Sequence, residues 1–349
     1  MNVSFSSALV KVVDHASRMD HEALRRYFGD LRNPEQRLAL AKRLHPLELV
    51  VDRLRSTSGN PINILDVGCG CGIVSVTLAE MGHSVLGIDI HEGRLDFARK
   101  LARGLGLSNQ ISVVNSDVLT VLSDHRYRAN FDIIWAEQSL HHIEPRYRVV
   151  SKLAQSLKIG GSLILSEAAG DYFPLKVFFA LKGRFRPLTV LSGNALNSFY
   201  GNERIFAARS FLSLAKHIFE FDVTQDSRFR VFPSRWLRFK IFYLLEQKIE
   251  SSQFLNFLCV NWSVELKKKS DKINPPDFQV STMQYHQLSA LPKLNKRDRL
   301  LESFYILPDL GWVYRLVILG CHSRANSVER RSIVFVEKKR WQSLTKKLL

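Results

Sequence analysis

Residues 64–72 read Ile-Leu-Asp-Val-Gly-Cys-Gly-Cys-Gly, an apolar stretch that runs directly into a glycine-rich turn. Residues 61–67 are apolar, β-branched and bounded by turn residues, which is typical of a buried parallel strand. Residues 73–81 then read as a helix, so the turn would present the free N–H groups of a helix N-terminus. Open α/β sheets bind ligands at the carboxyl ends of their strands. The sequence therefore predicts a nucleotide-like ligand at this turn.

The spacing of the glycines distinguishes between the ligands that such a turn can hold. A phosphate-binding P-loop needs a Lys and a Ser or Thr after its last glycine, and Ile73 and Val74 stand there instead. In the dinucleotide fingerprint G-x-G-x-x-G the third glycine would stand at Ile73, whereas Gly72 comes one residue earlier. Asp66 would repel a pyrophosphate. It suits a cation such as S-adenosylmethionine, which carries a sulfonium and an α-amino group and no phosphate.

Further stretches follow the glycine turn in a recognisable order. An apolar strand ends in an acid, Asp89, 17 residues after Gly72, and a later strand leads to Asp117. Together the stretches resemble the ordered motifs of the class I S-adenosylmethionine-dependent methyltransferases, over just under a third of the chain. They are residues 64–72, 85–90, 111–118, 131–137 and 157–167.

The resemblance implies a fold, a cofactor and a set of binding residues. The fold is α/β, a seven-stranded Rossmann-like, mostly parallel sheet with helices on both faces. In the family the acid at Asp89 takes the two ribose hydroxyls, as a carboxylate with two acceptor oxygens can, and the acid at Asp117 contacts adenine. The cofactor-binding residues predicted on this basis are Asp66, Gly68, Cys69, Gly70, Gly72, Asp89, Ile90, Asp117, Val118 and Glu137.

Plainer interpretations of these residues stay open. Asp66 could be a helix N-cap, Asp89 a strand-end turn residue, and Asp117 the cap of the next short helix. Cys69 and Cys71 lack the spaced ligand set of a zinc site, so we interpret them as small residues of a glycine turn and predict no metal. Four scattered cysteines in a chain of 349 residues indicate a reducing compartment without a disulfide framework.

Two adjacent histidines are the candidates for a general base. Methyl transfer from a sulfonium is an in-line displacement, so the protein mainly aligns the acceptor with the methyl carbon. A hydroxyl acceptor also needs a base, which is often His near neutral pH. His142 and His141 directly follow the fourth predicted strand, in a segment that faces sulfonium and substrate in the family. At most one of them would be catalytic, and the alternative role of both is helix packing or capping.

The acceptor is constrained by what the fourth motif lacks. Residues 136–139 read Ala-Glu-Gln-Ser, without the Asn- or Asp-Pro-Pro-aromatic turn of the enzymes that methylate base or protein amide nitrogens. We therefore expect the acceptor to be an oxygen or carbon of a small molecule, sugar or lipid-linked substrate. The alternatives are an RNA methyltransferase and a non-catalytic relative that serves in binding.

The positive charge of the chain is concentrated in its second half. Residues 1–169 hold 20 Lys and Arg against 18 Asp and Glu, whereas residues 170–349 hold 30 against 15. Basic and aromatic residues alternate in 178–186 and 229–240, which would suit an anionic substrate, an anionic membrane surface or, less well, nucleic acid. The alternative is a solvated basic face without a specific partner. We expect a cytoplasmic protein, with peripheral contact at the inner membrane surface as a further expectation.

The chain is expected to have three parts. Residues 1–57 would form an N-terminal helical cap and residues 58–269 the methyltransferase core, with a substrate lid at 170–201. Residues 270–349 would form a basic C-terminal extension. The sixth and seventh strands are placed at 219–223 and 261–266; a rival assignment makes 316–319 and 333–336 the final hairpin and 170–310 an insertion. Neither a signal peptide nor a membrane span is expected.

Overall fold

The computed structural model describes residues 3–19, 21–58, 61–143, 146–169, 208–252, 254–255 and 258–273. The predicted lid at 170–201 and the rival hairpin lie outside the described residues, as does all of the predicted extension beyond residue 273. The division of the chain into cap, core and extension therefore stays a prediction.

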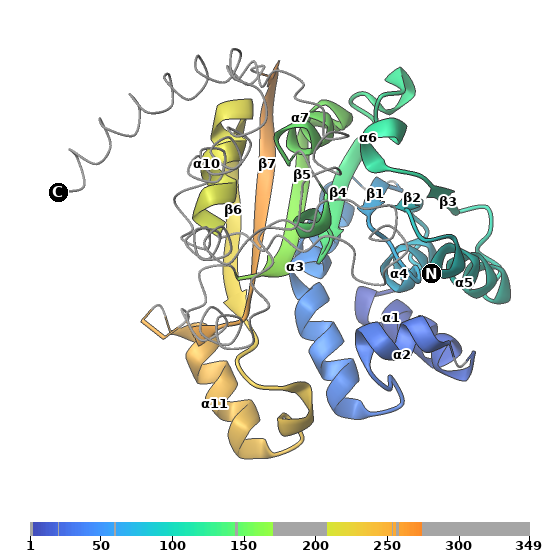
Figure 1. The fold of residues 1–349 in the computed structure, drawn as a ribbon, viewed down its shortest axis with the longest axis vertical. Coiled ribbons are helices and arrows are strands. Elements are labelled where there is room, and N and C mark those ends of the chain that lie inside the picture. Colours follow the sequence, from blue (N-terminus) through green and yellow to red (C-terminus); the bar gives the residue numbers. More distant parts are fainter. Residues whose placement is uncertain are drawn as a thin grey trace, which may run out of the picture.

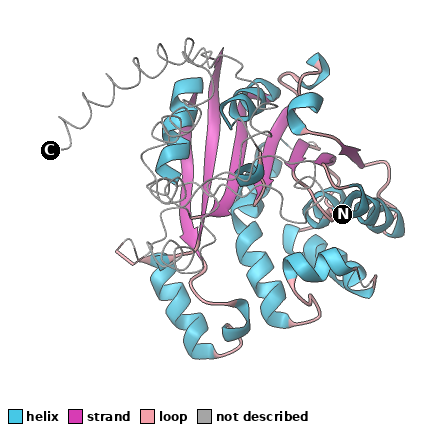
Figure 2. Cartoon of the chain, viewed as in Figure 1, coloured by secondary structure: helices cyan, strands magenta, loops and turns pink. Residues whose placement is uncertain are grey.

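Among the described residues, the central feature is one seven-stranded sheet (Figures 1 and 2). The strand order is β3-β2-β1-β4-β5-β7-β6, in which β7 alone runs against the others. The predicted mostly parallel α/β fold is thus confirmed. The strands are β1 (Asn63–Val67), β2 (Ser84–Asp89), β3 (Ile111–Asn115), β4 (Phe131–Glu137), β5 (Leu157–Ala168), β6 (Phe219–Phe229) and β7 (Asn261–Ile273).

Both faces of the sheet are buried under helices, which explains why its central strands lack polar alternation. On β4, Ile133 and Trp135 pack into one core cluster, whereas Ile134 and Ala136 pack into the other. The first cluster includes residues of α1, α3, α4 and α5, and the second includes residues of α7 and α10. Between β1 and β6, the described residues form the helices α4 (Ile73–Glu80), α5 (Glu92–Gly104), α6 (Val118–Val121), α7 (Arg146–Ser156) and α10 (Ala208–Ile218), with short 3-10 turns η1 (His125–Tyr127) and η2 (Leu140–His142).

Strands β6 and β7 are longer than the sequence predicts. Their paired register runs from Phe229 and Asn261 to Phe219 and Ile273, with two irregularities. Much of β6 is exposed or half-buried. Because this part of the strand buries few side chains, it has no apolar pattern by which the sequence could reveal it.

In the described part of residues 3–58, three helices precede the sheet: α1 (Phe5–Arg18), α2 (Glu22–Phe28) and α3 (Pro34–Ser58). The region predicted as helical is broken by a turn at Gly29, whose φ of +71° is left-handed. Helix α3 extends past the lower end of the sheet in Figure 1. It is fastened to the sheet by an ion pair between Arg53 and the fully buried carboxylate of Glu265 on β7.

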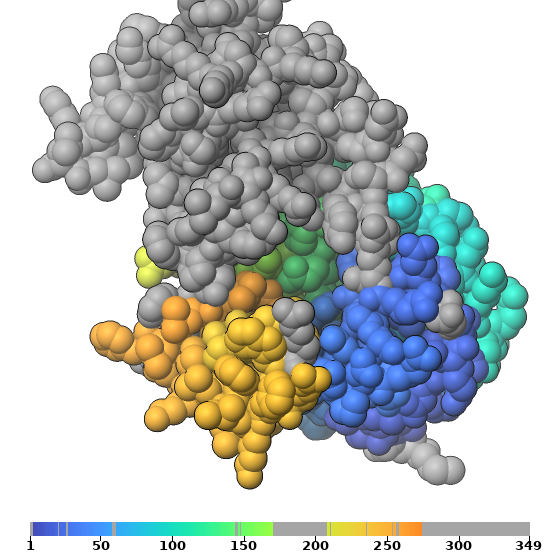
Figure 3. Space-filling model, turned by 60° about the horizontal axis from the view of Figure 1, so that its bottom comes forward, coloured from blue at the N-terminus to red at the C-terminus, as the bar shows by residue number. Residues whose placement is uncertain are grey.

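An insertion between β6 and β7 carries η3 (Ser234–Trp236) and α11 (Lys240–Ser251). Lys42 of α3 reaches it, since its Nζ lies 2.6 Å from Glu246 and 3.1 Å from Glu250 of α11. Figure 3 shows the insertion, in gold, beside the blue N-terminal helices. Within the described part of the chain, no helix has the length and apolar character needed to cross a membrane.

Candidate functional site

The glycine turn between β1 and α4 has the geometry that its sequence predicts. Gly68, Gly70 and Gly72 have φ of +73°, +52° and +72°, all in the left-handed region that favours glycine. A Cβ on Gly72 would stand 2.5 Å from the Cβ of Ala98, so this glycine lets α5 approach closely. A Cβ on Gly70 would meet only Asp89 Oδ2, at 4.0 Å. The turn therefore leaves room for a ligand at Gly70.

Asp89 ends β2 directly beside this turn. Its Oδ2 accepts a hydrogen bond from the Gly70 N–H (2.9 Å) and its Oδ1 one from the His91 N–H (2.8 Å). Each carboxylate oxygen keeps a second lone pair, so the fixed carboxylate can still accept two hydroxyl groups. Ile90 follows with 53% of its surface exposed, an apolar face at the strand end. The Asp89 carboxylate thus suits a ribose diol, and the exposed Ile90 side chain suits the face of a planar base.

Asp66 lies one strand away and is only 3% exposed. Its Oδ2 accepts a hydrogen bond from the Ser75 hydroxyl (2.6 Å), whereas the N-cap position of α4 is occupied by Gly72. Burial raises the pKa of Asp66 to about 7, and the negative charges of Glu137 and Asp89 add to the rise. A cationic ligand at this edge would stabilise the ionised form.

Asp117 caps the short helix that follows it, which is the alternative role that the sequence left open for this residue. Its Oδ1 accepts the N–H groups of Leu119 (2.8 Å) and Thr120 (3.3 Å) at the start of α6. Val118 beside it is buried. Because the capping bonds use one oxygen of an exposed side chain, contact with adenine stays a prediction for Asp117 and Val118.

Glu137, at the carboxyl end of β4, is held by a residue that the sequence did not single out. Arg43 of α3 forms an ion pair with it, and both side chains are largely buried. The guanidinium carbon of Arg43 also lies 5.3 Å from the ring centre of Phe28. An arginine in a helix far upstream carries no sequence signal of this contact, because only the packing of α3 creates it.

The two candidate histidines differ in their surroundings. His141 is 8% exposed, and its Nδ1 lies 2.6 Å from Glu167 Oε2 at the end of β5. The other oxygen of Glu167 accepts the N–H groups of Ser139 and Leu140. His142 is half-buried, and its ring centre lies 4.0 Å from that of His141. Glu167 thus orients His141. This contact joins the end of β5 to the segment after β4, and the sequence analysis did not predict it.

Helix α2 brings Tyr27 into contact with Arg94 of α5, the helix that follows β2. The Tyr27 hydroxyl accepts a hydrogen bond from Arg94 (3.2 Å), whose guanidinium carbon lies 4.9 Å from the Tyr27 ring centre. Burial raises the pKa of Tyr27; the charge of Arg94 opposes this rise and that of Asp89 adds to it. The electrostatic effect of Asp89 indicates that Tyr27 lies near it. Tyr27 was also not predicted.

The thiols of the glycine turn are buried. Burial raises the pKa of Cys71 to about 12 and that of Cys69 well above its usual range. Both therefore stay protonated at neutral pH, a form in which thiols are poor nucleophiles and poor metal ligands.

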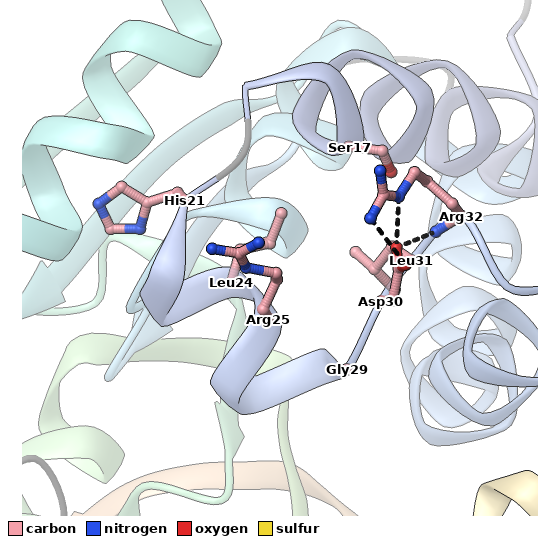
Figure 4. Close-up of a pocket in the computed structure, with 8 residues that line it drawn as sticks. All are labelled: Ser17, His21, Leu24, Arg25, Gly29, Asp30, Leu31 and Arg32. Carbon is pink, nitrogen blue, oxygen red and sulfur yellow. Dashed lines mark hydrogen bonds and ion pairs between the residues drawn. The ribbon is translucent and has the colours of Figure 1, made fainter.

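A pocket also lies between the end of α1, α2 and the start of α3 (Figure 4). Its wall includes Asp30 and Arg32, joined by two hydrogen bonds of 2.8 and 2.9 Å. None of the predicted cofactor residues lines it, so we do not assign it to the cofactor. The lining residues are Ser17, His21, Leu24, Arg25, Gly29, Asp30, Leu31 and Arg32.

The site is an α/β nucleotide-binding site of the Rossmann-like kind, defined by the strand order, the left-handed glycine turn and the fixed carboxylate at the end of β2. Residues 64–161 match a family model described as "Methyltransferase domain". This part of the chain is therefore a class I S-adenosylmethionine-dependent methyltransferase domain, and its cofactor is S-adenosylmethionine.

Curated relatives agree with this assignment over part of their length. An O-methyltransferase of Pyrenophora dematioidea is 30% identical over 146 residues, 42% of this chain and 52% of that protein. Methyltransferase GfsG of Streptomyces halstedii is 32% identical over 122 residues, 34% and 42% of the two chains. The ubiquinone biosynthesis O-methyltransferase of Coxiella burnetii is 29% identical over 153 residues, 42% and 62%. The chain thus spans about half the length of these relatives.

A solved structure, the magnesium protoporphyrin IX methyltransferase of Synechocystis PCC 6803, is similar over 75% of this chain and 100% of that one. The sequence identity is 19% and the TM-score 0.46.

Proposed function

We propose that the protein transfers the methyl group of S-adenosylmethionine to an oxygen atom of a small molecule, with carbon as the alternative acceptor. The observation that carries the proposal is the pair of adjacent histidines just after the carboxyl end of β4, whose ring centres lie 4.0 Å apart and one of which is fixed by Glu167. A base at this position serves a hydroxyl acceptor. Relatives named as O-methyltransferases support oxygen over carbon.

The residues of the chain have distinct tasks in this reaction. The bound cofactor supplies a methyl group on a positively charged sulfur. The glycine turn and Asp89 hold its nucleoside part, while Asp66 and Glu137 place negative charge near its cationic part. These groups orient the methyl carbon toward the acceptor.

We assign the proton transfer to His142 and the support of its ring to His141. His142 is the less buried of the two, whereas His141 is committed to Glu167. As the acceptor oxygen bonds to the methyl carbon, the carbon–sulfur bond breaks and the hydroxyl proton passes to the histidine. The neutral product S-adenosylhomocysteine then leaves with the methylated acceptor.

Methyl transfer can be tested without knowing the acceptor. The full chain is incubated with methyl-labelled S-adenosylmethionine and a native small-molecule extract, and labelled products are identified by mass spectrometry. We expect a labelled ether or ester whose yield falls at least 100-fold in His142→Ala. A labelled RNA as the sole product would favour the RNA alternative, and the absence of any labelled product would favour a binding protein.

We further propose a cytoplasmic location with peripheral contact at an anionic membrane surface, which would suit a lipid-linked substrate. The support for the membrane contact is the insertion between β6 and β7, where large apolar side chains are exposed next to the basic residues Arg238 and Lys240. Trp236 is 40% exposed, Phe239 48% and Ile241 71%.

Vesicle sedimentation tests this contact. Retention by vesicles with anionic lipid at low salt should fall several-fold in Ile241→Ser. A wild-type protein that stays in the supernatant would contradict the membrane contact.

A further inference from the structure

Arg230 lies at the same edge of the sheet as the cofactor residues. It directly follows β6, which runs parallel to β4 and β5, so it shares the carboxyl edge with Glu137 and Asp89. Its backbone is held on both sides: its N–H donates to Glu250 Oε1 (2.7 Å) and its carbonyl accepts from the Val260 N–H (2.7 Å). The start of its side chain therefore has a fixed direction.

The backbone of Arg230 is strained. Its φ of +65° lies in the left-handed region, where a residue with a Cβ is disfavoured and glycine is not. Glycine would satisfy this turn without the strain. A side chain that is kept under strain beside a binding site points to a role for that side chain.

The charge of Arg230 has no matching acceptor among the described residues. Burial lowers its pKa, and the positive charge of Arg43 lowers it further against the attraction of Glu246. Yet the carboxylates around it are engaged elsewhere. Glu246 accepts Lys42 and two backbone N–H groups, Glu250 accepts Lys42 and the backbone of Arg230, and Glu137 is paired with Arg43.

Negative and positive side chains therefore lie at different places along this edge of the sheet. Asp66, Asp89 and Glu137 lie at the ends of β1, β2 and β4, on the side that receives the cationic cofactor. Arg230 lies at the end of β6, beyond β5 and β7, and Arg43 of α3 reaches the same edge, where it pairs with Glu137 of β4. A half-buried arginine without a partner is costly unless a ligand pairs with it.

We infer that the Arg230 guanidinium, with Arg43 beside it, is a binding subsite for an anionic group of the methyl acceptor. The planar guanidinium presents two parallel N–H donors, which match the two oxygens of a carboxylate or a phosphate. This inference rests on the proposed methyltransferase function and deepens it: the acceptor is an anion, opposite in charge to the cofactor.

Binding of simple anions tests the inference. The full chain is saturated with S-adenosylhomocysteine and titrated at low ionic strength with benzoate and with phenyl phosphate, two probes that differ in the anionic group. We expect at least one of them to saturate below 10 mM, and the stronger probe reveals which anion the subsite prefers. Arg230→Gly should weaken that probe at least tenfold.

The choice of variants separates binding from folding. Glycine removes the backbone strain, so Arg230→Gly should unfold at the same temperature as the wild type or higher. Arg230→Lys keeps the positive charge but loses the paired N–H donors of the guanidinium. Its affinity for the probe should therefore lie between those of the wild type and Arg230→Gly. The matched control is Arg126→Gln, an exposed arginine of η1 before β4, which should bind both probes as the wild type does.

The contrary outcomes are distinct. Equal binding of both probes by Arg230→Gly and the wild type, or no binding of either probe by the wild type, would overturn the anion subsite. In each case S-adenosylhomocysteine would still bind with its normal affinity. If the wild type failed to bind S-adenosylhomocysteine, the proposed function itself would be wrong.

Discussion

Relative to the wild type, Asp66→Asn should raise the free energy of unfolding of the cofactor-free protein, and it should raise it more at pH 8 than at pH 5. Asp66 is 3% exposed, and burial raises its pKa from 3.8 to about 7. Asparagine keeps an oxygen that can accept the Ser75 hydroxyl, but it cannot ionise. The substitution therefore isolates the cost of burying a negative charge beside the glycine turn.

The size of the effect follows from the two pKa values. The folded state binds the Asp66 proton more tightly than the unfolded state, so this proton stabilises the fold fully below pH 3.8 and ceases to do so above about pH 7. The shift of roughly 3 units corresponds to about 4 kcal/mol in total. About 2.5 kcal/mol of this falls between pH 5 and pH 8, because the unfolded side chain is already ionised at pH 5.

Urea unfolding of both full-length proteins at pH 5, 6, 7 and 8 measures this difference directly. Contributions of groups that do not interact with Asp66 cancel when the wild-type free energy of unfolding is subtracted from that of the variant. Ser75→Ala serves as a second variant: it removes a hydrogen bond that lowers the pKa of Asp66, so the pH dependence should extend to higher pH. A difference between Asp66→Asn and the wild type that does not change with pH would refute the reasoning.

Three other substitutions test separate parts of the molecule. Asp89→Ala should weaken S-adenosylmethionine binding at least tenfold by calorimetry, because it removes the predicted ribose acceptor and two turn contacts; an unchanged affinity would refute the ribose assignment. Gly72→Ala should lower the free energy of unfolding by about 2 kcal/mol, since its Cβ would stand 2.5 Å from an α5 alanine. The control Gly106→Ala, with φ of +74° and no atom within 4 Å, should cost about 1 kcal/mol; equal losses would contradict the close approach. Glu246→Ala should cost about 3 kcal/mol in urea unfolding, because it removes the fully buried partner of Lys42 and the acceptor of two backbone N–H groups, while Glu250 still pairs with Lys42; a loss below 1 kcal/mol would count against a stabilising role of Glu246.

The sheet and its edge could be predicted because each strand carries its own signal. β1, β2 and β4 are short apolar runs, and Asp66, Asp89 and Glu137 stand in or directly after them. Parallel strands bring their carboxyl ends together, so residues far apart in the sequence could be assigned to one site.

The side chains that complete the site could not be predicted in this way. Arg43 and Tyr27 reach it from helices that precede the sheet, and Arg230 reaches it from an insertion between β6 and β7. Their positions depend on how α2, α3 and α11 pack, and no local pattern of residues encodes that packing. Asp117 shows a different limit, because the same acid at the same strand end serves as a helix cap.

The most direct test of the account is a calorimetric titration of the full chain with S-adenosylmethionine and, separately, with NAD. The glycine spacing and the buried Asp66 favour a cationic nucleoside without a pyrophosphate, and the fixed Asp89 suits its ribose. The account predicts saturable binding of one S-adenosylmethionine per chain and no measurable binding of NAD. Saturable binding of NAD, or no binding of S-adenosylmethionine, would contradict it.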